Sequence, residues 1–385
     1  MRSKTIAFTS VFAGILLFGV SMVIIGSVLP LLKVRLGLNN IEAGGLFSIL
    51  PFGLLIGSIF FGPLGDRYGY KWVLATASLF LAIGFMGIAH AQILLVLRAC
   101  IFLFGVGGGV INGATSALIS DLSSDDKKIA NLNLLGVFFG LGAFSMPIVL
   151  STIPESSYTA AMNITAVISV LIAVLFLSIT YPITVEKEKI SFKLIPLFLK
   201  NRLFLIICFF LFFQSAFEAI INNWSVSYFT QHLQVAQNQA LIALSFSVLG
   251  LTLMRILTGG VFRNIGTKKL IHIAFALLSA GVICLFIQSP SAIYINIFGL
   301  FLIGAGLSPG FPVMLGLTGS LYKEVSGTAF SFVMLIALSG NMIINYITGL
   351  LIQSYSISIL VYIIFAEIVA MIGLYSFIRK DIKSL

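Results

Sequence analysis

Charged side chains are scarce in this sequence. Asp, Glu, Lys and Arg make up 9% of its 385 residues, whereas 59% are hydrophobic and the mean hydropathy is +1.14. A soluble globular domain carries about 25% charged residues, because its surface has to be solvated by water. This scarcity excludes a soluble globular protein and indicates that lipid is the solvent for most of the chain.

Cysteine and histidine are also rare, with three residues of each. Each cysteine falls inside an apolar stretch, and no two have the spacing of metal ligands; they are Cys100, Cys208 and Cys284. The histidines lie at the ends of different apolar stretches; they are His90, His232 and His272. We therefore expect no disulfide framework and no metal site. The sequence also has no evident nucleophile–base pair or nucleotide-binding loop, so we expect neither enzyme activity nor catalytic residues.

Long apolar runs, in contrast, recur along the whole chain. A transmembrane helix needs about 20 apolar residues, and we assign twelve such spans. They are 7–30, 42–61, 72–89, 93–120, 129–152, 160–181, 203–229, 239–261, 270–288, 291–314, 327–350 and 355–378. The first is too long for a signal peptide and runs on into further spans, so it is read as span one. The predicted fold class is an all-α membrane protein with twelve transmembrane helices.

The net charge of +10 lies mostly on one side of these spans. Basic residues precede span one, follow spans two, four, six, eight and ten, and end the chain, with Lys33 and Arg35 as the main exceptions on the other side. This is the positive-inside pattern. It predicts a multi-pass protein of the cell membrane with both termini in the cytoplasm. Because the charge orients the protein in a bilayer, we expect no nucleic-acid partner.

A polar interval divides the spans into two sets of six. We expect an N-terminal half at 1–185, a cytoplasmic central loop at 186–202 and a C-terminal half at 203–385. Glycines recur at matching depths in the two halves. At an offset of 197 residues, Gly53, Gly62, Gly69 and Lys71 fall on Gly250, Gly259, Gly266 and Lys268; at 199, Gly105 and Gly107 fall on Gly304 and Gly306. Repeated halves that rock about a midplane site are typical of secondary transporters, although glycines at helix contacts would also produce such matches.

The segment between spans two and three carries a specific motif, Gly-Pro-Leu-Gly-Asp-Arg-Tyr-Gly-Tyr-Lys at 62–71, with a degenerate copy at 259–268. It resembles the signature loop of the major facilitator superfamily, with Tyr70 where an arginine is usual. The resemblance implies a major facilitator fold of two pseudo-symmetric six-helix halves. It also implies a gating role for Asp66 and Arg67, with Gly62 and Gly69 allowing tight helix ends. Arg67 is expected to pair with Asp121 at the end of span four; the alternative is a topological anchor.

A second resemblance is to fucose-permease-like sugar transporters within that superfamily. It rests on Glu218 and Trp224 in span seven, on Gly250 and Arg255 in span eight, and on the glycine-rich span four. The sugar–proton symporters of that group carry acids on their first and fourth spans. Here span one has none, and span four has Asn112 at mid-depth. Proton coupling therefore cannot be transferred directly from the resemblance.

A polar stripe runs along span seven. Gln214, Glu218 and Asn222 are spaced i, i+4 and i+8 and so share one helix face. With Trp224 they offer hydrogen bonds to hydroxyl groups and an aromatic surface for a sugar ring. We predict that they bind substrate together with Asn112, Asn341 and Asn345. The alternative is polar contact between helices, with the aromatic residue at the membrane interface.

Four ionisable residues are predicted inside the bilayer, where such groups are functional candidates by default; they are Arg98, Glu218, Arg255 and Glu367. Glu218 is the leading candidate for coupling, either by exchanging a proton or by binding sodium. Arg255 is a second coupling candidate, with helix packing or gating as its alternative. Glu367 is interpreted as a packing residue whose polar groups are satisfied. The pair Pro309 and Pro312 in span ten indicates either a flexing gate helix or a static kink.

These features favour a cation-coupled importer of a small polar solute, in particular a monosaccharide. The expected partners are that substrate and the lipid bilayer, with the chain acting as a monomer and with a proton or sodium as coupling ion. The alternative is a proton-coupled drug or metabolite exporter. Two departures count against it. Such exporters have an arginine on span four followed four residues later by a glycine, whereas Arg98 is followed by Phe102. Span five also lacks their Gly-Pro pair. A membrane receptor without transport is a third reading, which the intact gating loop disfavours.

The predicted orientation can be tested by cysteine-accessibility labelling. Single cysteines introduced into the interval 182–202 and near both termini should react with a membrane-impermeant maleimide only after the cells are opened, because these segments are expected in the cytoplasm. Labelling of the central interval in intact cells would overturn the assigned topology.

Overall fold

The computed structural model describes residues 2–181, 195–262, 265–287 and 292–383. Within these ranges the chain is helical and forms no strand. The first helix group comprises α1 (Arg2–Leu36), α2 (Asn40–His90), α3 (Leu94–Leu122), α4 (Asp125–Thr152) and α5 (Tyr158–Ser178). After the short α6 (Ile195–Lys200), the second group comprises α7 (Arg202–Gln231), α8 (Gln237–Gly259), α9 (Thr267–Leu285), α10 (Ile293–Leu307), α11 (Gly310–Leu321), α12 (Ser326–Ser354) and α13 (Leu360–Lys383).

The helix α2 contains two membrane spans. Its 51 residues would extend about 76 Å at 1.5 Å per residue, whereas the hydrocarbon core of a bilayer is about 30 Å thick. Gly69 interrupts it with φ 76° and ψ 162°, a conformation that favours glycine. The segment 62–71, expected as a loop, is therefore helical on both sides of this single break.

Whereas α2 joins two predicted spans, the predicted span ten is divided into two helices, α10 and α11, at Ser308 and Pro309. Together they form one apolar stretch, Ile293–Leu321, which reaches seven residues beyond the predicted end of the span. Eleven stretches of the described chain are long and apolar enough to cross a membrane. Because the 51-residue stretch counts twice, the twelve predicted spans are confirmed in an all-α membrane fold.

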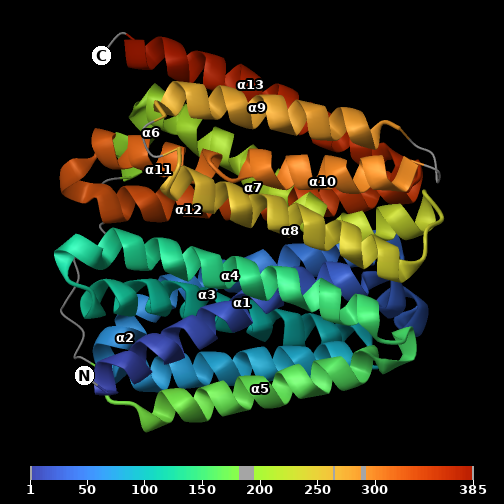
Figure 1. The fold of residues 1–385 in the computed structure, drawn as a ribbon, viewed down its shortest axis with the longest axis horizontal. Helices are drawn as coiled ribbons and strands as arrows, with labels where there is room; N and C mark the ends of the chain where they lie inside the picture. Colours follow the sequence, from blue (N-terminus) through green and yellow to red (C-terminus); the bar gives the residue numbers. More distant parts are fainter. Residues whose placement is uncertain (1, 182–194, 263–264, 288–291, 384–385) are drawn as a thin grey trace.

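The two helix groups lie side by side, with the first group below the second in Figure 1. The beginning of α1 and the end of α13 lie at the left of that view, and we call this the terminal end of the bundle. Contacts between the groups run between α1 and α7, α2 and α12, and α4 and α8. The predicted division at 185/186 lies outside the described residues, whereas α6 and Asn201 fall in the predicted central loop.

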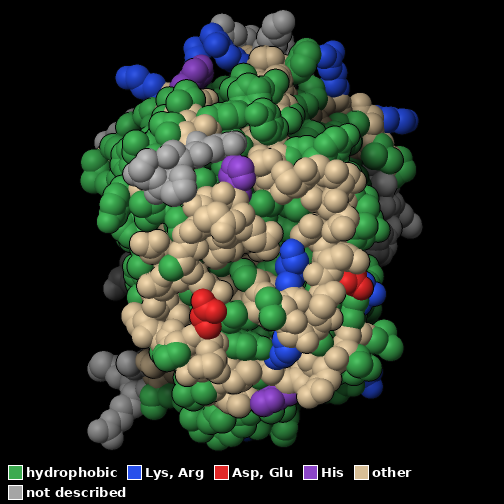
Figure 2. Space-filling model, turned by 90° about the vertical axis from the view of Figure 1, so that its right-hand side faces the viewer, with side chains coloured by type: hydrophobic (Ala, Val, Ile, Leu, Met, Phe, Trp, Pro, Cys, Tyr) green, Lys and Arg blue, Asp and Glu red, His purple; other side chains and the backbone are tan. Residues whose placement is uncertain are grey.

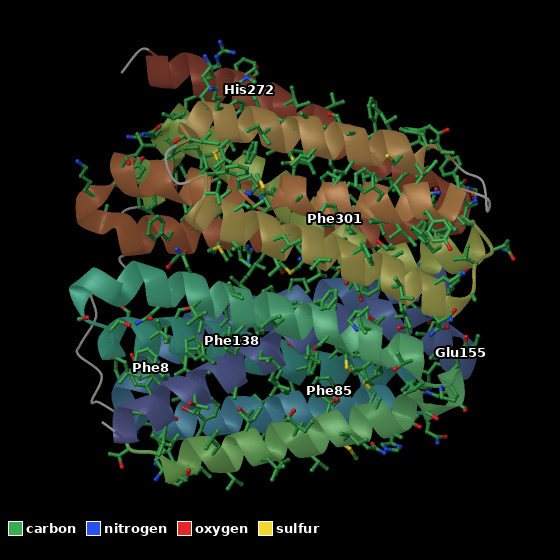
Figure 3. All side chains as sticks on the ribbon, in the orientation of Figure 1. Phe8, Phe85, Phe138, Glu155, His272 and Phe301 are labelled. Atoms are coloured by element: carbon green, nitrogen blue, oxygen red, sulfur yellow. The ribbon has the colours of Figure 1, made fainter. Side chains whose placement is uncertain are left out.

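Glycine pairs bring helices within each group into backbone contact. A Cβ atom on Gly53 of α2 or on Gly105 of α3 would overlap a carbonyl oxygen of the other helix. Gly250 and Gly304 repeat this arrangement between α8 and α10, where a Cβ on Gly250 would overlap the carbonyl oxygen of Phe301, labelled in Figure 3. The glycine repeat in the sequence thus corresponds to one packing device used twice.

A side chain at one of these contacts should weaken the fold. We expect Gly250→Leu to lower the free energy of unfolding by about 1–3 kcal/mol or more, because α8 has to move away from α10. Gly373→Leu on α13 is the matched control, since nothing lies within 4 Å of a Cβ built there. Thermal unfolding of the purified protein in detergent measures both; equal melting temperatures for the two variants would contradict this account of the packing.

Candidate functional site

A cavity of about 210 Å³ lies between the two helix groups. This volume exceeds by more than tenfold the roughly 10–15 Å³ that one water molecule needs on the same measure, so the cavity can hold a small organic molecule. Its apolar wall includes Phe18, Met22, Phe47, Leu54, Phe139, Leu251, Phe311 and Met334. Its polar side chains are Ser58, Asn112, Ser215, Glu218, Asn222, Asn223, Ser247 and Asn341.

The lining brings together four of the predicted substrate-binding residues. Glu218 and Asn222 come from α7, Asn112 from α3 and Asn341 from α12, so the site draws on both helix groups. Amide and carboxylate groups beside aromatic rings are the groups that orient a small polar ligand in an otherwise apolar pocket. Glu218 contributes the carboxylate of this lining, which contains no other Asp or Glu among the described residues.

Asn345 lies behind the lining and supports it. It is fully buried, accepts a hydrogen bond of 3.1 Å from Asn223 Nδ2, and donates to the main-chain oxygen and Oδ1 of Asn341 at 2.9 and 3.2 Å. Because Asn223 and Asn341 both line the cavity, this amide chain fixes one wall of the site across α7 and α12. The structure thus assigns Asn345 an indirect place in the predicted site.

Trp224 and Gln214 also lie outside the lining. The fully buried ring of Trp224 makes an edge-to-face contact with Phe47 of α2, with centroids 5.2 Å apart. Gln214 Nε2 donates a 2.9 Å hydrogen bond to the carbonyl of Leu307, the last residue of α10, while its Oε1 lies against Gly310, the first residue of α11. Trp224 therefore joins the two helix groups, and Gln214 spans the break in span ten.

Arg255 does not reach the central cavity but lines a second one, described below. Its charge interacts electrostatically with the carboxylate of Glu218, which lines the central cavity. No hydrogen bond joins this pair in the described part of the chain.

The gating motif has a different partner from the one expected. The hydroxyl of Tyr70 donates a 2.6 Å hydrogen bond to Asp121 Oδ2, whereas the Arg67 guanidinium lies 5.2 Å from the centre of the Tyr68 ring. The predicted Arg67–Asp121 pair is therefore wrong for this structure. The physical reason is the residue at position 70, whose phenol reaches Asp121 directly from the start of the next helical segment after Gly69.

The interpretation of Glu367 as a satisfied packing residue is also wrong. Glu367 on α13 is 3% exposed, and neither carboxylate oxygen has a hydrogen-bond partner among the described residues.

Several residues of the cavity lining were not predicted from the sequence, notably Asn223, Ser215, Ser58 and Ser247. Asn223 could have been found from its place beside Asn222, but serines and phenylalanines are too frequent in these spans to stand out.

Comparison with known proteins identifies the family. The sequence model of the Major Facilitator Superfamily matches residues 11–344 and, in a second match, 214–384. The chain belongs to the Major Facilitator Superfamily. Its members of known fold are transporters and not enzymes, and the twelve-span, two-group arrangement of this chain is the fold expected of a member.

Two curated relatives illustrate the range of the superfamily around this chain. The MFS-type efflux pump MMF1 of Mycosarcoma maydis is 25% identical over 193 residues, 48% of this chain and 31% of the relative. The arabinose-proton symporter of Escherichia coli (strain K12) is 25% identical over 166 residues, 43% of this chain and 34% of the relative. The matched region thus spans about a third of the length of each relative.

Solved structures match over nearly the whole chain. A variant of the nucleoside transporter NupG has a TM-score of 0.80 at 14% identity and covers 98% of this chain and 99% of its own. A variant of the Escherichia coli fucose:proton symporter FucP has a TM-score of 0.66 at 17% identity, with the same coverage. At these identities the likeness shows the fold, and it confirms the predicted resemblance to sugar transporters of this superfamily at that level.

The Tyr70–Asp121 hydrogen bond can be tested by a double-mutant cycle on stability. Tyr70→Phe and Asp121→Ala should each lower the free energy of unfolding by about 1–3 kcal/mol, because each removes the hydrogen bond between the phenol and the carboxylate. The double variant should cost no more than the larger single loss. Tyr68→Phe is the control, since this ring is 52% exposed. Strictly additive losses would contradict the hydrogen bond.

Proposed function

We propose that this chain is a secondary active transporter that imports a monosaccharide together with a cation, by alternating access. The observation that carries the proposal is the composition of the central cavity, in which amides and one carboxylate stand among aromatic side chains. Sugars present hydroxyl groups at their edges and apolar C–H surfaces on their ring faces, and this lining complements both. The likeness to the fucose:proton and arabinose-proton symporters supports the same substrate class.

The proposed coupling residue is Glu218. A carboxylate inside a membrane protein that faces a cavity is a candidate carrier of a proton or binder of sodium, since it can change its charge or be neutralised by an ion. Its position among the substrate-binding amides would let substrate and ion occupy neighbouring places. The second coupling candidate is Arg255, whose charge acts on Glu218 from outside the cavity.

The proposed orientation has both termini in the cytoplasm of a cell membrane and the protein working as a monomer. Described basic residues gather at the terminal end, among them Arg67, Lys71, Lys268, Lys269 and Lys323. Figure 2 shows the opposite end, where charged side chains are scattered. This asymmetry supports a cytoplasmic terminal end under the positive-inside rule. Asp66 and Arg67 would then belong to the gate on the cytoplasmic side, with Gly62 and Gly69 at its helix ends.

A second candidate function is export of an amphiphilic drug or metabolite. It is favoured by the number of phenylalanines in the cavity lining and by the likeness to an efflux pump. A single carboxylate among the described lining residues would suffice for proton antiport as well as for symport. The direction of solute movement relative to the ion gradient distinguishes the two functions.

Uptake by reconstituted vesicles tests the proposed function. A panel of radiolabelled monosaccharides should accumulate above equilibrium only when an inward proton or sodium gradient is imposed. Solute movement against the ion gradient would establish the exporter instead. The absence of accumulation for every monosaccharide, with transport of another solute class, would overturn the proposed substrate.

The role of Glu218 is tested in the same vesicles with Glu218→Gln. If Glu218 carries the coupling proton, this variant should abolish uphill accumulation but preserve solute exchange, because a neutral amide mimics the protonated acid. If Glu218 binds the substrate directly, affinity should fall by about 1–3 kcal/mol. Glu367→Gln is the control, a buried acid that lies outside the cavity lining. Normal accumulation together with normal affinity in Glu218→Gln would refute both roles.

A further inference from the structure

A second cavity, of about 1040 Å³, lies toward the terminal end of the bundle between α4, α8, α9 and α11, and we call it the side groove. Its lining comprises Leu132, Asn133, Leu134, Gly136, Val137, Arg255, Ile256, Thr258, Gly259, Gly260, Thr267, Leu270, Pro309, Pro312, Val313, Gly316, Leu317 and Ser320. The central cavity is lined also by α1, α2, α3 and α12, and none of these helices contributes to the side groove. The two cavities share the helices α4, α8 and α11 but no lining residue.

The side groove combines an apolar rim with a polar, cationic interior. Leu132, Leu134 and Ile256 are 36%, 41% and 48% exposed, so the groove presents apolar side chains on the surface of a membrane-spanning protein. Farther in, Arg255 is accompanied by Asn133, Thr258, Thr267 and Ser320, and the described lining contains no Asp or Glu. An apolar rim that opens to lipid and a positively charged interior are together complementary to an anionic amphiphile.

The Arg255 guanidinium retains its hydrogen-bonding capacity. Its Nη1 lies 4.0 Å from the place where a Cβ on Gly136 would be, so the side chain reaches across the groove toward α4. It has no hydrogen bond to another side chain in the described part of the chain, and Glu218 acts on it only through space. A guanidinium with free donors is well suited to a phosphate group.

Comparison of the two halves explains why the groove exists. At the repeat offsets of 197 and 199 residues, Tyr70 corresponds to Thr267 and Asp121 to Ser320. In the first helix group the side chains of Tyr70 and Asp121 occupy the equivalent position and are joined by a hydrogen bond. In the second group both positions hold small hydroxyl residues, and both line the side groove. The second half thus lacks a large side chain and a negative charge where the first half has both.

The second half keeps the positive charge that the first half carries after its signature motif. Lys268 corresponds to Lys71 at the offset of 197, and Lys269 adds a second exposed lysine in the first turn of α9. No side chain caps this turn, because Gly266 is its N-cap residue, so its N–H groups also present a positive helix end. Two lysines that follow the lining residue Thr267 thus bring positive charge near the groove, without the acid that the first half carries.

We propose that the side groove binds an anionic phospholipid, with its phosphate near Arg255 and Ser320 and its acyl chains along the apolar rim. The phosphate takes the place in the second half that the Asp121 carboxylate takes in the first. A lipid seated between α4 and α8 touches both helix groups at once. Its presence would therefore stabilise this arrangement of the groups relative to any arrangement in which α4 and α8 move apart.

Native mass spectrometry of the detergent-purified protein tests the proposal. Phosphatidylglycerol should be retained in preference to phosphatidylcholine with identical acyl chains. Arg255→Gln should reduce the retained phosphatidylglycerol about fivefold, the change expected for the loss of one cationic contact near a lipid headgroup. Gly316→Phe should abolish the preference, because a Cβ at Gly316 meets nothing within 4 Å and the ring would fill the groove.

Two controls make this experiment decisive. Gly373→Phe places the same ring at an equally open position on α13, outside the groove, and should bind phosphatidylglycerol as the unmodified protein does. Inorganic phosphate, added at increasing concentration, should not displace the lipid, since the acyl chains contribute to binding. Equal retention of both lipids, unchanged binding in correctly folded Gly316→Phe, or full displacement by phosphate would each overturn the proposal.

Discussion

Lipid offers no hydrogen-bond partners, and this constraint governs the structure at every level. Backbone groups have to be satisfied within helices, so a break in a span needs a partner from the protein itself. At the break between α10 and α11, Gln214 donates to the carbonyl of Leu307 and places its amide oxygen beside Gly310. The Gln214 amide thus bonds to the end of α10 and lies against the start of α11, and its Oε1 has no hydrogen-bond partner among the described residues. A helix interruption that lipid would penalise is stabilised by a residue one turn from Glu218.

The same constraint determines where polar side chains gather. In the described interior, amides occur in a chain from Asn223 through Asn345 to Asn341, and two of these three face the central cavity. Asn112 and Glu218 join them from other helices. Glu367 lies apart from this cluster, and neither of its buried carboxylate oxygens has a hydrogen-bond partner in the described chain. Burying a neutral carboxylic acid without a hydrogen-bond partner costs far less free energy than burying a carboxylate ion.

The sequence alone predicts the fold well, because a bilayer prescribes how long an apolar stretch has to be. It could not predict that 62–71 is helical on both sides of Gly69, since the break depends on one dihedral pair. For the site, Gln214 and Glu218 share a helix face, yet Glu218 meets the cavity and Gln214 meets α10. Helical spacing defines a face but not which neighbour lies opposite each turn. Likewise, the partner of Asp121 depends on a single residue, Tyr70, at a position where the family has another type.

The two halves share a backbone plan but differ in chemistry. Gly53 and Gly105 pack as Gly250 and Gly304 do, so the helix contacts that shape each half are repeated. At the same offsets, however, Ser58 corresponds to Arg255 and Asn112 to Phe311. Ser58, Asn112 and Phe311 line the central cavity, whereas Arg255 lines the side groove. Backbone symmetry allows the two similar halves to move about a shared site. The difference in side chains means that Ser58 and Arg255, at equivalent positions of the two halves, line different cavities. A cavity built on that plan takes amides and phenylalanines from both halves, but at non-equivalent positions, so a bound solute would meet different groups at equivalent places of the two halves.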